Sequence, residues 1–173
     1  MEFLSTIKGL IPDYAKDIRL NLDGTIARSS LEGNDAVAVA LAAAFAAKSR
    51  VIVDAIRDAG VLSPEETSAV LTAAALMGMN NVWYPFVEMA DDPDLATQPA
   101  GLRMNAYATH GGVDKRRFEM YALAASIVGK CHFCIKSHYT LLKNEQGMTA
   151  QQLRDVGRIA AVVVAAANVI AAE

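Results

Sequence analysis

The stretch "DKRRFEMYALAASIVGKCHFCIKSH", residues 114–138, has the pattern of two helices joined at a break. Asp114 is a residue type that caps helix N-termini, and small apolar residues at helical spacing follow it as far as Gly129. Glycine commonly ends a helix. We expect a second helix to begin near Lys130 and to run to Gly147. If the chain turns back at the break, the two helices form an antiparallel pair.

The break carries the only two cysteines of the chain, Cys131 and Cys134, and His138 follows four residues later. Residues three and four positions apart lie on the same face of a helix, so the two thiols and the imidazole form one stripe. Cys131 would lie in the first turn, where the helix dipole and free N–H groups favour a thiolate. One activated sulfur with a second sulfur beside it suits dithiol redox chemistry.

Glu119 is a candidate partner of His138. Glu119 lies ten residues before Gly129 and His138 lies nine residues after it, so at about 1.5 Å per residue both are roughly 14 Å from the break. An antiparallel pair would therefore bring the carboxylate level with the imidazole, where it fixes the tautomer and raises the basicity. In a straight continuation the carboxylate would be about 18 Å from Cys131 and no relay would form.

Three other interpretations of the cysteines stay open. A structural disulfide between residues three apart closes a very small loop and stabilises weakly. A zinc ion could take Cys131, Cys134, His138 and Glu119, although closed zinc sites usually use a second Cys/His pair, which this chain lacks. Both cysteines could also be small buried hydrophobic residues. A thioredoxin fold needs strands around its CxxC, and no strand pattern is present.

The composition indicates one globular domain, residues 1–173, with 53% hydrophobic and 20% charged residues. The net charge is −3, and the densest basic run, "DKRRF" at 114–118, is interpreted as the solvated first turn of a helix. We therefore expect no nucleic-acid interface. The N-terminus lacks a basic region followed by an unbroken apolar stretch, so no signal peptide is expected. The apolar runs 36–47 and 159–172 are predicted to be buried core helices rather than membrane spans, which indicates a cytoplasmic protein.

The remaining pattern predicts an all-α fold without a significant sheet. Further helices are expected over 36–48, 50–59, 63–78 and from Thr149 to the C-terminus, with capping boxes at Ser63–Glu66 and Thr149–Gln152. Gly78 is expected to end the third of these helices. Residues 84–112 are rich in Pro, Asp and Gly and should form loops, with one short helix around 101–108.

An internal repeat is suggested by the segments 63–78 and 114–129, which have equal length, similar residue classes and an offset of 51. We interpret them as parts of a duplicated helical pair, with repeat halves at roughly 34–83 and 114–172. The first copy has Asn80 and Trp83 where the second has Cys131 and Cys134. Only the second copy would then carry the redox chemistry.

Taken together, these residues resemble the alkylhydroperoxidase D (AhpD) family, within the carboxymuconolactone decarboxylase-like superfamily. The family motif is a glutamate, twelve residues, CxxC, three residues and a histidine, which Glu119, Cys131, Cys134 and His138 reproduce. The segments "LIPDYAKDIRLNL" (10–22), "LMGMNNVWYPF" (76–86) and "GLRMNAYA" (101–108) also look like the family. The resemblance thus extends over most of the chain.

This resemblance implies an AhpD-like helical bundle, a homotrimer and an antioxidant activity as a lipoyl-dependent peroxidase and disulfide reductase. Electrons would pass from dihydrolipoyl groups, on an acyltransferase served by lipoamide dehydrogenase, to hydroperoxides and to the peroxiredoxin AhpC. It implies that Cys134 forms the sulfenic acid and the mixed disulfide, that Cys131 is the proton donor and resolving thiol, and that Glu119 and His138 form the proton relay. No metal or tightly bound cofactor is implied. A decarboxylase-like lyase, in which the cysteines are idle, is the alternative within the superfamily. A zinc-stabilised binding module is the alternative from another functional class.

Overall fold

Every regular element of the chain is a helix, as predicted. The computed structural model describes residues 1–173 and contains no strand. The helices are α1 (Glu2–Gly9), α2 (Lys16–Leu22), α3 (Asp35–Ala46), α4 (Arg50–Asp58), α5 (Pro64–Ala90), α6 (Pro93–Ala96), α7 (Asn105–Ala108), α8 (Lys115–Gly129), α9 (His132–Asn144) and α10 (Ala150–Ala172). Short 3₁₀ turns cover Asp13–Ala15 and His110–Gly112, and a π-turn covers Asp23–Ala27.

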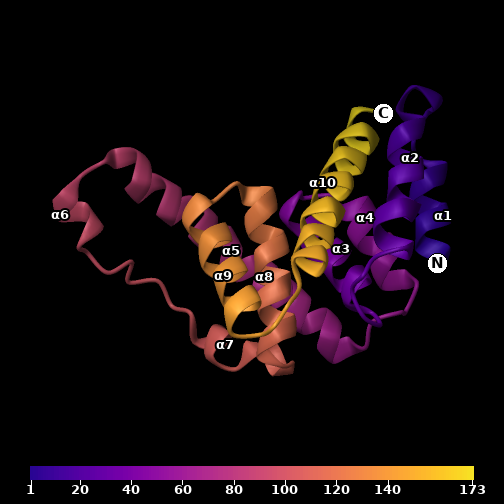
Figure 1. The fold of residues 1–173 in the computed structure, drawn as a ribbon. Coiled ribbons are helices and arrows are strands. Elements are labelled where there is room, and N and C mark those ends of the chain that lie inside the picture. Colours follow the sequence, from indigo (N-terminus) through magenta and orange to yellow (C-terminus); the bar gives the residue numbers. More distant parts are fainter.

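Helix α3 lies at the centre of the core. Its residues 35–44 are all buried, and helices α5, α8 and α10 pack around it (Figure 1). A helix that is apolar on every side is stable only when neighbours cover all of its faces, and its many alanines let those neighbours approach closely. The prediction that residues 36–47 form a buried core helix is therefore confirmed.

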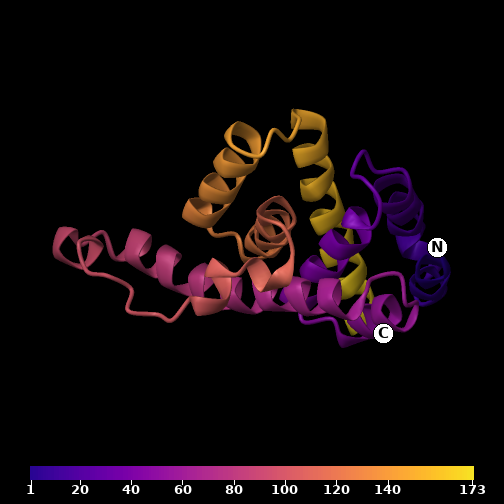
Figure 2. The same ribbon diagram turned by 90° about the horizontal axis from the view of Figure 1, so that it is seen from below.

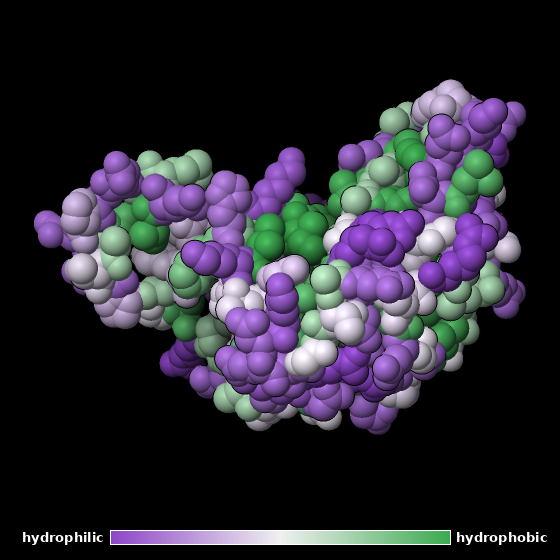
Figure 3. Space-filling model, in the orientation of Figure 1, coloured by the Kyte–Doolittle hydropathy of each residue, from purple (hydrophilic) through white to green (hydrophobic).

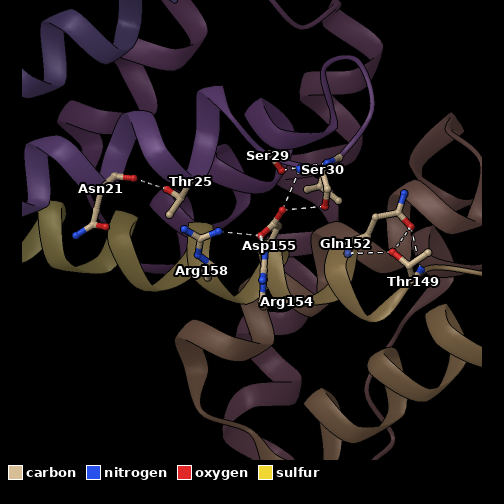
Figure 4. A network of polar contacts seen from close by, with 10 residues as sticks. Asn21, Thr25, Ser29, Ser30, Thr149, Gln152, Arg154, Asp155 and Arg158 are labelled. Carbon is tan, nitrogen blue, oxygen red and sulfur yellow. Dashed lines mark hydrogen bonds and ion pairs between the residues drawn. The ribbon is translucent and has the colours of Figure 1, made fainter.

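Helix α10 covers one side of α3. It is long and apolar enough to cross a membrane by length and composition alone, and 44% of its most apolar window is buried within the protein. The buried carboxylate of Asp155 ties α10 to the segment before α3 (Figure 4): Oδ2 accepts hydrogen bonds from the backbone N–H of Ser30 at 2.9 Å and from its hydroxyl at 2.8 Å. Arg154 and Arg158 donate to Oδ1. These contacts orient α10 with a buried polar anchor as well as apolar packing.

The predicted helix starts are confirmed. Ser63 with Glu66 and Thr149 with Gln152 form reciprocal capping boxes, and the side chain of Asp114 accepts from the N–H of Arg117. The observed helices Asp35–Ala46 and Arg50–Asp58 match the expected ranges within two residues. N-cap side chains satisfy free N–H groups at helix starts, so they are local signals that the sequence carries.

The expected end of a helix at Gly78 is wrong, because α5 continues through Gly78 and Pro85 to Ala90. A single glycine costs a helix about 1 kcal/mol relative to alanine and does not by itself stop it. The left-handed residue that ends the helix is Asp91, with φ 49°. The expected loop over 84–112 therefore begins with helix, although α7 does fall within the short helix predicted at 101–108.

The distal part of α5, helix α6 and the chain that returns from it, residues 82–104, form an arm. Figures 1 and 2 show the arm extending away from the helices packed around α3. Several large apolar side chains on or next to it are exposed. These residues are Met79, Val82, Phe86, Met89 and Leu102. Figure 3 shows apolar surface on the arm and in the hollow between the arm and helix α10.

Helices α5 and α8 lie side by side and run in the same direction. Nη1 of Arg117 donates to Oε1 of Glu66 at 3.1 Å, and Sγ of Cys131 lies 3.9 Å from the carbonyl oxygen of Asn80. Both pairs are 51 residues apart, which is the offset of the suggested repeat. The break after α8 has no counterpart within α5. The internal duplication itself stays a prediction.

The run 114–118 was interpreted as a solvated helix turn, but its Arg117 makes ion pairs with Asp35 and Glu66. Nε of Arg117 lies 3.0 Å from Oδ1 of Asp35, whose side chain is only 3% exposed. Burial raises the pKa of Asp35, and the neighbouring Arg117 and Arg116 oppose that shift. A buried carboxylate at the start of α3 needs a compensating cation, and the guanidinium of Arg117 is that cation. The same guanidinium also pairs with Glu66 on α5.

Candidate active site

The turn between α8 and α9 places the cysteines at a helix start. Gly129 is the last residue of α8, and the reversal is made by Lys130, whose backbone is left-handed at φ 55° and ψ 31°. Gly129 is needed for another reason: a Cβ there would overlap the side chain of Asn81, which donates to the carbonyl of Ala125 at 3.1 Å. The glycine thus allows α5 to approach α8 closely beside the cysteines.

Cys131 and Cys134 form a disulfide, with their Cα atoms 5.3 Å apart. Cys131 is the N-cap residue of α9, and its Sγ accepts from the backbone N–H of Cys134 at 3.2 Å. Cys131 is fully buried, whereas Cys134 is 3% exposed and lines a pocket. A reagent that enters the pocket therefore meets the sulfur of Cys134 first.

The predicted meeting of Glu119 and His138 is confirmed. Oε2 of Glu119 lies 2.6 Å from Nδ1 of His138, because α8 and α9 run antiparallel on either side of the turn. Glu119 is completely buried and His138 is 6% exposed. Burial raises the pKa of Glu119, but hydrogen bonds from His138 and Tyr107 outweigh it, and the pKa is lowered overall. Glu119 is thus a carboxylate at neutral pH, and Nδ1 of the imidazole carries the proton.

Two residues of the site were not predicted from the sequence. The hydroxyl of Tyr107, on α7, donates to Oε1 of Glu119, and burial together with this bond raises the pKa of Tyr107. Sδ of Met77, on α5, lies 3.2 Å from Nε2 of His138. Tyr107 lies in the "GLRMNAYA" segment noted above, but no local spacing connects it to Glu119. Met77 has only the pattern of an apolar helix residue.

The active-site pocket has a volume of about 350 Å³. Its lining brings together side chains from α5, α7 and α9. These residues are Asn80, Tyr84, Met104, Tyr107, Ala108, Phe133, Cys134, Ser137 and His138. The pocket therefore presents one sulfur of the disulfide, an imidazole and a phenol within an otherwise largely apolar wall.

The other histidines lie outside this cluster. His132 is exposed, and its Nδ1 is 3.3 Å from Oε1 of Glu88. His110 is in a turn, as expected, beside the rings of Tyr107 and Phe118. No group of three or more His, Cys, Asp or Glu side chains is placed to hold a metal ion.

Comparison with known proteins identifies the family. The model of the carboxymuconolactone decarboxylase family matches residues 93–173, which include Glu119, both cysteines and His138. A protein of Rhodospirillum centenum is 40% identical over 98% of this chain and 91% of its own length. A Bradyrhizobium protein is 40% identical over 98% and 93%, and one of Hyphomonas neptunium is 41% identical over 98% and 94%. All three are named alkyl hydroperoxide reductase AhpD. With such identity along nearly its whole length, the chain belongs to the AhpD family of alkyl hydroperoxide reductases.

Proposed function

We propose that the protein is a thiol-dependent peroxidase that reduces alkyl hydroperoxides with the dithiol of Cys131 and Cys134. The carrying observation is the bridged pair of cysteines, of which Cys134 faces a pocket shared with His138, itself held by a buried carboxylate. Relatives at 40% identity carry the name of this activity.

The peroxide step begins with the thiolate of Cys134. Nε2 of His138 takes the thiol proton, and Glu119 stabilises the imidazolium while Sδ of Met77 lies next to the new N–H. The thiolate attacks the terminal oxygen of ROOH, the O–O bond breaks, and Cys134 becomes a sulfenic acid. The departing alkoxide takes the proton of the Cys131 thiol and leaves as ROH.

The disulfide then forms within the pair. The thiolate of Cys131 attacks the sulfenic sulfur of Cys134 and displaces hydroxide, which receives the proton held by His138 and leaves as water. The two cysteines have together lost two electrons, and ROOH has become ROH and H₂O. The structure corresponds to this oxidised state of the pair.

Reduction returns the dithiol. A thiolate of a dihydrolipoyl group attacks Sγ of Cys134, the sulfur that faces the pocket, and Cys131 leaves as a thiolate at the start of α9. There the N–H of Cys134 and the helix dipole stabilise the charge. The second thiol of the lipoyl group then attacks the lipoyl sulfur bonded to Cys134. The cyclic lipoyl disulfide forms, and Cys134 leaves as a thiolate. A lipoyl-bearing acyltransferase with lipoamide dehydrogenase would supply these electrons, without a tightly bound cofactor.

In the reduced protein, the thiolate of Cys134 would instead attack a disulfide of the oxidised peroxiredoxin AhpC and form a second mixed disulfide. Cys131 would then attack Cys134, close the Cys131–Cys134 disulfide and release reduced AhpC. We further propose a homotrimer in the cytoplasm. The exposed apolar side chains of the arm, among them Val82 at 70% and Met89 at 78% exposure, support self-association because such surface is costly to leave in water.

Titration of free thiols, combined with metal analysis, tests this proposal. The reduced protein should show two thiols per chain, none after one equivalent of tert-butyl hydroperoxide, and no bound metal. Two thiols that persist would favour a lyase in which the cysteines are idle. A stoichiometric metal released on oxidation would favour a zinc-stabilised module.

A further inference from the structure

A second pocket, of about 630 Å³, adjoins the active-site pocket. It lies between the distal part of α5, the chain that returns from α6 and the first turns of α9. Its lining is mainly apolar and aromatic. These residues are Trp83, Tyr84, Val87, Glu88, Ala96, Gln98, Pro99, Ala100, His132, Phe133 and Lys136. Pockets of this size with mostly apolar walls and few polar groups are typical of small-molecule sites.

Two stacked rings separate the pockets. Tyr84 and Phe133 line both of them, and their ring centroids are 4.3 Å apart with an interplanar angle of 22°. Phe133 is 55% exposed, although it immediately precedes the reactive Cys134 in the chain. A molecule that passes along these rings can have one end at Cys134 and the rest in the second pocket.

We propose that the second pocket is an alkyl-chain subsite, which takes the unbranched apolar chain of a hydroperoxide whose –OOH end reacts at Cys134. This inference rests on the proposed function and specifies its substrate class. A small hydroperoxide needs only the pocket of about 350 Å³ that contains Cys134 and His138. A longer chain that extends along Tyr84 and Phe133, which line both pockets, meets the apolar walls of the second pocket.

The proposed subsite predicts how kcat/KM depends on the length of the alkyl chain. Each methylene that moves from water to an apolar wall improves binding by roughly two- to fourfold. The ratio kcat/KM should therefore rise along an n-alkyl hydroperoxide series once the chain extends past the two rings. It should level off when the second pocket is full.

The kinetic test uses the whole protein with hydrogen peroxide, tert-butyl hydroperoxide and n-alkyl hydroperoxides from butyl to dodecyl. Val87→Trp and Gln98→Trp fill the pocket from two different segments, α5 and the chain after α6, and the side chain of Gln98 is exposed, so folding should tolerate its replacement. Leu20→Trp is the matched control, because Leu20 is 67% exposed, lies on α2 away from the arm and does not line the pocket. Both filling variants should abolish the gain with chain length and leave the tert-butyl rate unchanged, whereas the control should behave as wild type.

Binding can be measured without turnover. Trp83 is the only tryptophan of the chain and lines the second pocket, so its fluorescence should change on titration with decan-1-ol, an unreactive analogue of the chain. Gln98→Phe should weaken this binding at least tenfold.

Three results would overturn the subsite: a wild-type kcat/KM that does not depend on chain length, no effect of decan-1-ol on Trp83, or filling variants that raise only the KM of the dithiol reductant. A wild-type protein that binds decan-1-ol but reduces no hydroperoxide would refute the proposed function and leave the apolar site intact.

Discussion

At the scale of single residues, the carboxylate of Glu119 is the group on which the proposed relay depends. It is completely buried and bonded to Nδ1 of His138. Glu119→Gln keeps the shape but removes the charge that stabilises the imidazolium. Because general-base assistance is worth about 10²–10⁴ in rate, peroxidase turnover should fall at least about tenfold.

The double variant decides whether Glu119 and His138 act together. His138→Ala should cost a factor similar to that of Glu119→Gln, and the two changes combined should cost little more than either alone. Steady-state turnover with tert-butyl hydroperoxide measures all three. Losses that multiply, or a Glu119→Gln protein with wild-type turnover, would contradict the relay.

Tyr107 is expected to be a positioning residue that acts through Glu119. Its hydrogen bond is one cause of the lowered pKa of Glu119. In Tyr107→Phe that pKa should rise, so Glu119 becomes protonated at higher pH and the acid limb of the pH–rate profile moves upward. Well above that limb, turnover should recover. A uniform loss at every pH would indicate a merely structural role.

The two cysteines should not be equivalent, because Cys134 lines the pocket and Cys131 is fully buried. Cys131→Ser leaves the attacking sulfur without its resolving partner, so a sulfenic acid should accumulate on Cys134 after peroxide treatment. In Cys134→Ser no sulfenic acid should form. Dimedone labelling with peptide mass spectrometry measures both, and a label on Cys131 in the second variant would reverse the roles.

At the scale of elements, Asp155 should govern how firmly α10 is held (Figure 4). Burial raises the pKa of Asp155, but hydrogen bonds from Ser30, Arg158 and Arg154 lower it from 3.8 to about 2. The stabilisation is therefore present above about pH 4 and is lost as the pH falls from about 4 to about 2. At 1.36 kcal/mol per pKa unit it amounts to about 2 kcal/mol.

Asp155→Asn should lower the free energy of unfolding at pH 7 by about this amount. The variant should also lose part of the stability change between pH 4 and pH 2, whereas the contribution of Asp35 stays the same in both proteins. Urea unfolding at several pH values measures the difference. Equal stability of the two proteins at pH 7 would show that the network contributes little.

The elements that were predicted correctly are those with local signals. The side chains of capping residues such as Ser63, Asp114 and Thr149 accept hydrogen bonds from free N–H groups in the first turn of their own helix. Each helix start could therefore be located from a few neighbouring residues. The end of α5 depends instead on packing along its whole length, and Gly78 gave a misleading signal. The site shows the same division: Glu119 and His138 follow from spacing around one turn, whereas Tyr107 and Met77 come from other helices through packing that no spacing pattern encodes.

At the scale of the whole molecule, the arm and its exposed apolar side chains predict assembly. Light scattering on a size-exclusion column should give about three times the 18.4 kDa chain mass at micromolar concentration. Val82→Asp with Met89→Asp places charges on this exposed surface and should shift the protein towards monomer. Wild-type protein that remains monomeric across this range would contradict the trimer.

The path of the chain links the arm to Glu119 and His138 of the proposed relay. The segment that returns from the tip of the arm leads directly into α7, whose Tyr107 holds the carboxylate of Glu119. A force or contact that displaces the arm therefore pulls on the hydrogen bond that orients the relay. A protein that binds the arm, far from the sulfur atoms, would thus change how Glu119 is held. It would alter proton transfer in the proposed relay without contacting the pocket.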